Sequence, residues 1–418
     1  MIHTIRDAAA TRMQPLLARY FHDLPRDVVV LTLVAFCVAL GFGILSPVIP
    51  LFARSFGVSA FAASAVVSAF ALMRLISATP GSWLLNRVGE RTVLWIGLAI
   101  VALSSALAGF AASYEQLLVL RGLGGTGSAM FSVSSMALLL RTVDPAHRGR
   151  AASTYHSGFL FGGLAGPTVG GLVVGWSIRA PFFVYAVTLT LASLTAFFAL
   201  PRHPAQAELP AVAQAGSGAA AMSLRQALAL RVYWTTLVTN LASRITLFGL
   251  RSSLLPLFVL EALQRSATTA SLGFLLSSLS QACLLLPAGR MTDIRGRKPA
   301  MVLGTVSLVL AMLCLLLYGT LPDFYTAMLA MGAGAAFLGS GPAAIVGDLV
   351  GRRRGGPVVA TFQMTSDLGM VTGPLLVGWL KDVTGSFTVP FLVCLGIALE
   401  AVAMSCSMHE TYTRPTAS

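Results

Sequence analysis

A few ionisable side chains stand inside long apolar stretches of this sequence, and their types limit the chemistry that is available there. Asp367 and His156 can gain and lose a proton, whereas Arg121, Arg244 and Arg251 keep their positive charge at neutral pH. Ionisable groups at bilayer depth are costly, and they commonly mark ion or substrate pathways. The set predicts proton exchange and the binding of polar or charged groups.

The stretches that hold these residues are long enough to cross a membrane. The 418-residue chain is 56% hydrophobic and 10% charged, whereas soluble domains carry about 25% charged residues. Its mean hydropathy is +0.81. A spanning helix needs roughly 20 apolar residues, and we expect twelve of them, at about 28–53, 61–84, 92–112, 116–141, 151–176, 181–200, 232–260, 268–291, 300–321, 324–350, 357–380 and 387–408.

The twelve segments form two sets of six, separated by a polar linker that is rich in Pro and Gly. The sequence therefore predicts an all-α membrane protein with two six-helix bundles, at 28–200 and 232–408. We expect a cytoplasmic N-terminal segment at 1–27, a cytoplasmic linker at 201–231 and a cytoplasmic tail at 409–418.

The distribution of positive charge indicates the orientation of these helices. Twenty of the 28 Lys and Arg residues fall in the segments that are cytoplasmic if the N-terminus is inside, four fall in the opposite loops, and four lie within helices. This bias follows the positive-inside rule. It places both termini in the cytoplasm, and it explains the net charge of +13 without a nucleic-acid partner.

Small residues recur at regular intervals in two of the segments. The fifth segment has a glycine every fourth residue and an internal proline, a pattern that places the glycines on one helical face, lets a neighbouring backbone approach, and bends the helix. A related pattern returns 207 residues later, which indicates an internal repeat. We expect these positions to form a close-packed interface that slides and bends: Gly158, Gly162, Gly166, Pro167, Gly170, Gly171, Gly369, Gly373 and Pro374.

Four motifs in the chain resemble those of the major facilitator superfamily, specifically its twelve-helix drug:proton antiporters. Residues 40–50 resemble the LGxxxxxPVxP element, and Gly162–Gly171 matches GxxxGPxxGG. Arg121–Gly127 resembles RxxxGxG. The loops after the second and eighth helices resemble the gating motif GxxxDRxGRR, in which Asn86 and Asp293 take the position of the aspartate.

The resemblance implies that residues in and near these two loops hold the inner ends of the bundles together: Arg74, Asn86, Arg87, Gly89, Arg91, Asp293, Gly296, Arg297 and Lys298. The first loop departs from the motif at Ser82, Asn86 and Glu90, and the second departs at Ile294. Asparagine keeps hydrogen bonds but loses their charge-assisted part. We therefore expect the gate to depend more on Asp293 than on Asn86.

The resemblance also implies a central cavity lined by the first, fourth, seventh and tenth helices. We expect Asp367, Arg121 and His156 to take part in proton coupling. The expected cavity residues are Arg244, Arg251, Phe36, Phe42, Met130, Phe131, Trp234 and Phe248. The alternatives are a structural ion pair for Asp367, a hydrogen bond within its own helix for His156, and a side chain that extends to the membrane surface for Arg251.

These expectations favour a proton-coupled exporter of small amphiphilic compounds that works by alternating access in the cytoplasmic membrane of a bacterium. Arginine outnumbers acid in the expected cavity, which favours neutral or anionic substrates over cations. The alternative is a symporter or uniporter for a small anionic metabolite. We expect a monomer in contact with membrane lipid, with no cofactor beyond a proton gradient. Lone cysteines give no metal-site spacing and no pattern indicates an enzyme.

Overall fold

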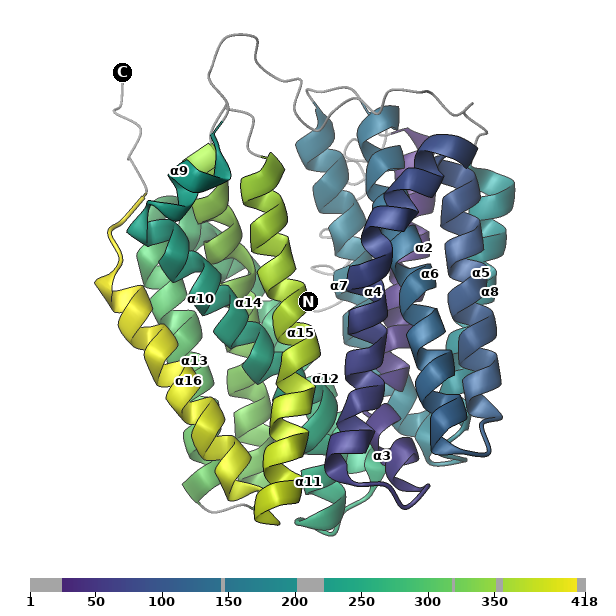
Figure 1. The fold of residues 1–418 in the computed structure, drawn as a ribbon, viewed down its shortest axis with the longest axis vertical. Coiled ribbons are helices and arrows are strands. Elements are labelled where there is room, and N and C mark those ends of the chain that lie inside the picture. Colours follow the sequence, from purple (N-terminus) through teal and green to yellow (C-terminus); the bar gives the residue numbers. More distant parts are fainter. Residues whose placement is uncertain (1–24, 144–146, 201–221, 318–319, 351–355, 412–418) are drawn as a thin grey trace, which may run out of the picture.

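The computed structural model describes residues 25–143, 147–200, 222–317, 320–350 and 356–411. Within these ranges the secondary structure is helical, and each predicted spanning segment corresponds to one long helix or to a run of consecutive helices (Figure 1). The N-terminal half contains α2 (Arg26–Leu45), α3 (Ile49–Arg54), α4 (Ala60–Val88), α5 (Glu90–Gly109), α6 (Tyr114–Thr142), α7 (Arg148–Val174) and α8 (Ala180–Ala199).

The C-terminal half has the same order of long helices. It contains α9 (Leu224–Leu228), α10 (Arg231–Thr246), the π-helical segment η2 (Leu247–Leu254), α11 (Leu255–Glu261), α12 (Ala267–Ile294), α13 (Arg297–Leu317), α14 (Leu321–Val350), α15 (Gly356–Thr384) and α16 (Thr388–Ser407). The predicted polar linker lies outside the described residues up to position 221.

Ten spans of the described chain are long and apolar enough to cross a membrane. The other two predicted spans are α6 and α15, each a helix of 29 residues. At a rise of about 1.5 Å per residue, such a helix is roughly 43 Å long, more than the roughly 30 Å hydrocarbon core of a bilayer. Both helices carry charged residues, Arg121 and Asp367 among them, which explains their lower hydropathy.

Each half has its own apolar core. In the N-terminal half, the rings of Phe52 and Phe182 meet edge to face at 5.1 Å. In the C-terminal half, the rings of Phe258 and Phe391 meet in the same way at 5.3 Å. The N-terminal core also includes Leu257 of α11, so the two halves share some apolar packing.

The two halves meet at one end of the molecule. We call the end at which α8 ends and α10 begins the linker end, and the opposite end, which holds α3 and α11, the far end (Figure 1). At the far end, Arg54 Nη2 lies 2.7 Å from Glu261 Oε1. These two residues come from different halves and are 207 positions apart, so they occupy equivalent places in the repeat.

Helix α15 adds further contacts between the halves. The Asp382 carboxylate accepts hydrogen bonds from the backbone N–H groups of Ala60 and Phe61, at 2.9 and 2.7 Å. It therefore caps the first turn of α4, where backbone donors lack helical partners. Deeper in the molecule, Ser68 Oγ donates to the Val371 carbonyl at 2.7 Å.

The glycine face of α7 packs against α2 inside the N-terminal half. A Cβ atom added at Gly158 would lie 2.3 Å from the Thr32 carbonyl oxygen, and one at Gly166 would lie 2.7 Å from the Gly43 Cα. The predicted close approach is present, but its partner helix belongs to the same half. Gly171 is different, because a Cβ there would lie 3.4 Å from Ser271 Cβ in the other half.

The C-terminal half repeats this arrangement. A Cβ atom at Gly369 would lie 2.6 Å from Arg244 Cβ, and one at Gly373 would lie 2.7 Å from the Ile245 carbonyl oxygen, so this face of α15 packs on α10. Gly378, one turn further along, meets Ala60 and Phe61 of α4 instead. The glycine stripes thus hold each half together, and neighbouring glycines make the contact between halves.

Candidate functional site

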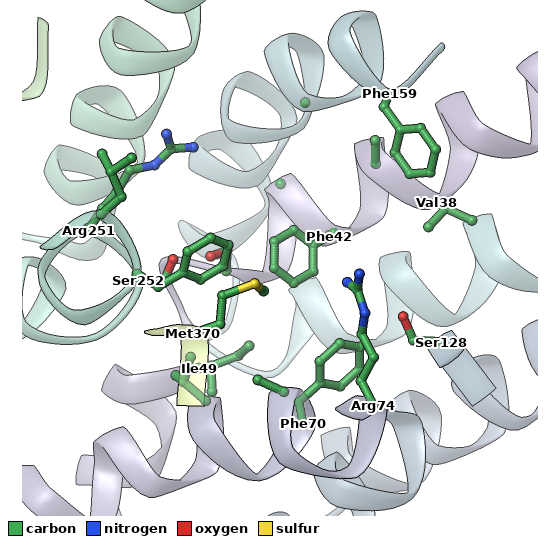
Figure 2. A pocket seen from close by; sticks show the side chains of 18 of the residues that line it. Val38, Phe42, Ile49, Phe70, Arg74, Ser128, Phe159, Arg251, Ser252 and Met370 are labelled. Carbon is green, nitrogen blue, oxygen red and sulfur yellow. The ribbon is translucent and has the colours of Figure 1, made fainter. Parts of the chain in front are cut away.

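A cavity of about 430 Å³ lies between the two halves. Its walls come from α2, α4, α6, α7 and α8 on one side and from α10, η2, α12, α14 and α15 on the other. Most of its surface is apolar and aromatic. The rings are those of Phe42, Phe70, Phe131, Phe159, Phe248 and Phe274, and Met370 lies among them (Figure 2). Such a lining accepts apolar groups of varied shape.

Four arginines also line this cavity: Arg74, Arg121, Arg244 and Arg251. Arg74 and Arg251 extend into it from opposite halves (Figure 2). Among the described residues, no Asp or Glu lines this cavity. The cavity is therefore a positively charged site with aromatic walls, as the sequence predicts for Arg244, Arg251, Phe42, Phe131 and Phe248.

The π-helical segment η2 positions Arg251. In a π-helix the backbone bonds run from residue i to i+5, and such segments often occur at functional sites. Arg251 Nη1 donates to Ser277 Oγ at 3.3 Å, and the guanidinium lies 5.2 Å from the centre of the Phe274 ring. The side chain thus faces α12 and the cavity rather than the far membrane surface.

Asp367 lies beside the cavity, about one helical turn before Met370, which lines it. Its carboxylate is within electrostatic range of Arg74 and Arg244. Arg74 belongs to the N-terminal half, and the other two residues belong to the C-terminal half. We call this group the Asp367 cluster; it places a carboxylate beside the cavity and within electrostatic range of arginines from both halves.

Arg74 has a different position from the one that the sequence suggests. We expect it from its sequence to brace the inner gate, but the structure places it on the cavity wall next to Phe70. The two side chains are four residues apart on α4, so they share a helical face.

Besides Asp367, which lies beside the cavity, four residues predicted for the cavity or for proton coupling do not line it. Trp234 is 50% exposed near the start of α10, and its Nε1 donates to the Leu228 carbonyl at 2.7 Å. Met130 is buried against Leu85 and Val93 on the opposite face of α6. Phe36 is six residues before Phe42 on α2, so its side chain is on a helical face about 120° away from the one that lines the cavity. His156 is exposed, and its Nδ1 lies 2.8 Å from the Ala152 carbonyl oxygen of its own helix.

The first gating loop makes its contacts inside the N-terminal half. Gly89 has a φ of 84°, a left-handed conformation that favours glycine. The Glu90 carboxylate pairs with Arg141 at 3.0 Å, so this departure from the motif connects α5 to α6. Arg87 lies over the Trp83 ring at 4.0 Å, and Arg91 donates to the Phe197 carbonyl of α8.

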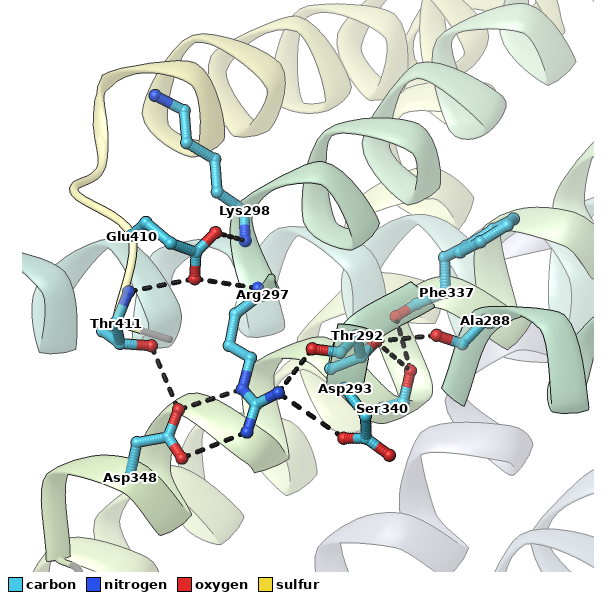
Figure 3. Close-up of polar contacts among 10 residues, drawn as sticks. All are labelled: Ala288, Thr292, Asp293, Arg297, Lys298, Phe337, Ser340, Asp348, Glu410 and Thr411. Carbon is cyan, nitrogen blue, oxygen red and sulfur yellow. Dashed lines mark hydrogen bonds and ion pairs between the residues drawn. The ribbon is translucent and has the colours of Figure 1, made fainter. Parts of the chain in front are cut away.

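The second gating loop makes a larger polar network (Figure 3). Arg297 holds Asp348 of α14 with two hydrogen bonds, at 3.0 and 3.2 Å, and reaches Asp293 at 3.5 Å. Glu410 accepts from the backbone N–H groups of Arg297 and Lys298 at 2.9 and 3.0 Å. The loop therefore joins α12, α13, α14 and the segment after α16.

The network leaves Asp293 at its edge, because this side chain is 75% exposed. Gly296 has a φ of 112° and is 207 residues after Gly89, so both loops use glycine at the same place in the repeat. In this conformation the described gating residues stabilise their own halves.

Some cavity residues were not predicted from the sequence. Phe70, Phe274, Tyr185 and Gln281 line the cavity from helices that the sequence alone does not assign to it. The spacing of Phe70 could have predicted its position, because it precedes the charged Arg74 by one helical turn and therefore shares its helical face. Phe274 has no charged residue at such a spacing that would have indicated the cavity.

Comparison with known proteins agrees with the architecture. The family model described as Major Facilitator Superfamily matches residues 31–261 and 241–416. Multidrug resistance protein MdtG from Salmonella paratyphi C (strain RKS4594) is 26% identical over 387 residues, which cover 90% of this chain and 93% of that protein. The Salmonella typhi protein of the same name is 25% identical with the same coverage.

Solved structures share the fold at lower identity. The nucleoside transporter NupG is 14% identical with a TM-score of 0.74, and the match covers 91% of this chain and 99% of that one. The human organic anion transporter MFSD10 is 19% identical with a TM-score of 0.64, covering 91% and 100%.

Two bundles of membrane-spanning helices around a central cavity define a multi-pass membrane transporter. The chain belongs to the Major Facilitator Superfamily, which confirms the superfamily and the fold that the sequence motifs predict.

Proposed function

We propose that this protein is a proton-coupled exporter of small amphiphilic compounds, which it moves by alternating access. The observation that carries the proposal is the Asp367 cluster, in which a carboxylate lies beside the cavity and within electrostatic range of arginines of both halves. Substrate in the cavity and a proton on Asp367 then affect the same contact between the halves. Similarity to the Salmonella proteins named for multidrug resistance supports export of amphiphiles.

The contacts between the halves support an inward-facing state for this conformation. Arg54 with Glu261, and Asp382 with the first turn of α4, close the far end. With the linker end in the cytoplasm, as positive charge predicts, the cavity would load substrate from inside. We propose that the protein works as a monomer in the cytoplasmic membrane, with the proton gradient as its energy source.

Proton release from purified protein tests the coupling. Neutral, anionic and cationic amphiphiles are added to detergent-purified protein in weakly buffered solution with a pH indicator. We expect release from the wild type for at least one compound, and none from Asp367→Asn. Glu400→Gln is the matched control, because this exposed carboxylate is on α16, away from the cavity. Release that persists in Asp367→Asn would contradict the proposed role of Asp367.

A symporter or uniporter for a small anion is the second candidate, and four arginines with no lining acid favour it. Whether protons are taken up or released when substrate binds distinguishes this candidate from the antiporter. An anion that bound between Arg74 and Arg244 would take the place of the Asp367 charge, so it would bind together with a proton. Proton uptake on binding therefore indicates symport, release indicates antiport, and binding without either indicates a uniporter.

A further inference from the structure

Arg121 is the most deeply buried arginine of the cavity, and its bonding is incomplete. Its side chain is 2% exposed. Nε and Nη1 are buried and have no hydrogen-bond partner, although buried polar groups are normally paired. The guanidinium lies 4.6 Å from the centre of the Phe70 ring. This contact offsets part of the cost of burying the charge but satisfies neither N–H donor.

The local structure holds Arg121 in this position. Gly125 allows the backbone of α4 to approach α6, because a Cβ there would lie 2.2 Å from the Phe70 carbonyl oxygen. The Phe70 ring is thereby fixed beneath the guanidinium. The charge is thus held in one place beside the cavity.

Hydroxyl groups line the same part of the cavity. Ser128 and Ser132 follow Arg121 on α6 by seven and eleven residues, so the three share one helical face. Tyr185 of α8 also lines the cavity and lies within electrostatic range of Arg121. The Ser128 and Tyr185 hydroxyls can donate to an oxyanion that a guanidinium binds with two parallel N–H bonds, whereas Ser132 Oγ already donates to the Ser128 carbonyl at 2.9 Å.

Arg121 is separate from the Asp367 cluster. The arginines that act on Asp367 are Arg74 and Arg244, whereas the interaction identified for Arg121 is with Tyr185. Arg121 lines the cavity with two donors that have no partner, and the acid beside the cavity has other cations.

We propose that Arg121, with Ser128 and Tyr185, forms a subsite for the oxyanion head group of an amphiphilic substrate, such as a carboxylate. The apolar part of the substrate then packs against Phe131 and Phe159, whose rings lie 6.2 Å apart. The inference rests on the proposed function, because it assigns a head group to the amphiphile that the cavity takes. It gives Arg121 a role in substrate binding rather than in proton transfer.

The separation of the two sites has a consequence for coupling. An anion at Arg121 leaves the charges of Arg74, Arg244 and Asp367 in place. An anionic amphiphile can therefore be exported in exchange for protons, which an anion bound within the Asp367 cluster would not permit.

A matched pair of probes tests the subsite. The compounds 2-naphthoate and 2-naphthamide have the same ring system and similar size, and they differ in the charge of one group. Their affinities are measured by calorimetry on the purified full-length protein at pH 7. We expect the wild type to prefer 2-naphthoate by about tenfold or more, the difference expected for charge-assisted hydrogen bonds.

Arg121→Gln should abolish this preference while the affinity for 2-naphthamide stays within about threefold, a result that also shows that the variant is folded. Arg121→Lys keeps the charge but loses the planar pair of donors, so it should keep part of the preference. Arg251→Gln removes the same charge from the other wall and should reduce the preference by less than about threefold.

Three results would overturn the subsite. These are equal wild-type affinity for the two probes, no binding of 2-naphthoate at millimolar concentration, and an equal loss of preference in Arg251→Gln and Arg121→Gln. If Arg121→Gln does not fold, the test relies on the preference of the wild type for 2-naphthoate and on its reduction in Arg121→Lys. Proton release is recorded in the same samples. A naphthoate preference without any Asp367-dependent proton movement would support the subsite and contradict the proposed antiport.

Discussion

Arg297 is the residue that connects the second gating loop to the rest of the C-terminal half. Its side chain donates two hydrogen bonds to Asp348, at 3.0 and 3.2 Å, and one to the Thr292 carbonyl, and its contact with Asp293 is longer and more exposed. In this conformation the Asp293 carboxylate has room to leave the network. In the proposed transport cycle, we expect this carboxylate to bind the first turn of a helix in the other half when the linker end closes, because backbone N–H groups there favour negative charge.

We therefore expect Asp293→Asn to lower the transport rate by tenfold or more, since a charge-assisted contact contributes about 1.5–3 kcal/mol. Asn86→Asp should change the rate less, because the first loop already lacks this charge. Transport of a fluorescent substrate into inverted vesicles measures both rates. Equal loss in the two variants would contradict the asymmetry.

Residue type indicates cavity residues only in part. A charge in an apolar helix is costly, and the sequence places Arg244 and Arg251 on the cavity, with extension to the membrane surface as the alternative for Arg251. Arg74 carries the same signal, but it is expected at the inner gate and lines the cavity instead. Aromatic residues give no such signal, because Trp234 and Phe248 are equally apolar and only one of them lines the cavity. Helix rotation decides between them, and rotation depends on packing against distant segments.

At the scale of elements, the pairing of α7 with α2 shows what a spacing pattern can and cannot predict. The four-residue glycine period correctly predicts close backbone approach. It does not name the partner helix, because any helix with a small-residue groove would fit. No sequence pattern predicts the π-helical segment η2. Gly249 within it lies close to α15, because a Cβ atom added at Gly249 would be 2.8 Å from the Gly373 carbonyl oxygen.

Substitutions along α7 test this packing. Gly166→Leu should insert into the membrane but slow transport and lower stability by about 1–3 kcal/mol, because its Cβ would overlap Leu40 and Gly43 of α2. Gly163→Ala is the control for stability, since a Cβ there meets no atom within 4 Å; because Gly163 lines the cavity, it does not serve as a control for transport. Thermal unfolding of the purified variants and vesicle transport are measured together. Normal transport and stability in Gly166→Leu would refute the role of close packing.

Pro167→Ala is a separate test of helix bending. Alanine restores the backbone donor that proline lacks, so we expect a straighter and more stable α7 with slower transport. Unfolding temperature should rise or stay constant while the transport rate falls. A parallel fall in both quantities would indicate that Pro167 acts only through stability.

At the scale of the whole molecule, the repeat of 207 residues brings equivalent residues of opposite charge together at the far end. Arg54 and Glu261 end α3 and α11, and their ion pair crosses from one half to the other. Gly166 and Gly373 are 207 residues apart, and so are Arg54 and Glu261, so the repeat makes these two charged residues equivalent. Their opposite charges can be read from the sequence, but their contact requires the far end to be closed, which is a property of the conformation.

Breaking this ion pair should shift the protein toward an outward-open state. The side chains are 33% and 26% exposed, so Glu261→Gln should cost about 1 kcal/mol, or roughly a fivefold change in the ratio of the two states. Spin labels at Ala112 and Arg265 of a cysteine-free protein would report a longer distance across the far end. Arg179→Gln is the control, because Arg179 contacts Phe52 and Gly109 of its own half.

The double variant Arg54→Glu/Glu261→Arg should return the distance distribution toward that of the wild type, because equivalent positions in the repeat can exchange their charges. Recovery in the double variant would show that the pair itself closes the far end. An unchanged distribution in Glu261→Gln would mean that the Asp382 cap on α4 is sufficient to hold the halves together. In that case Asp382→Asn, which weakens the hydrogen bonds to Ala60 and Phe61, should produce the opening instead.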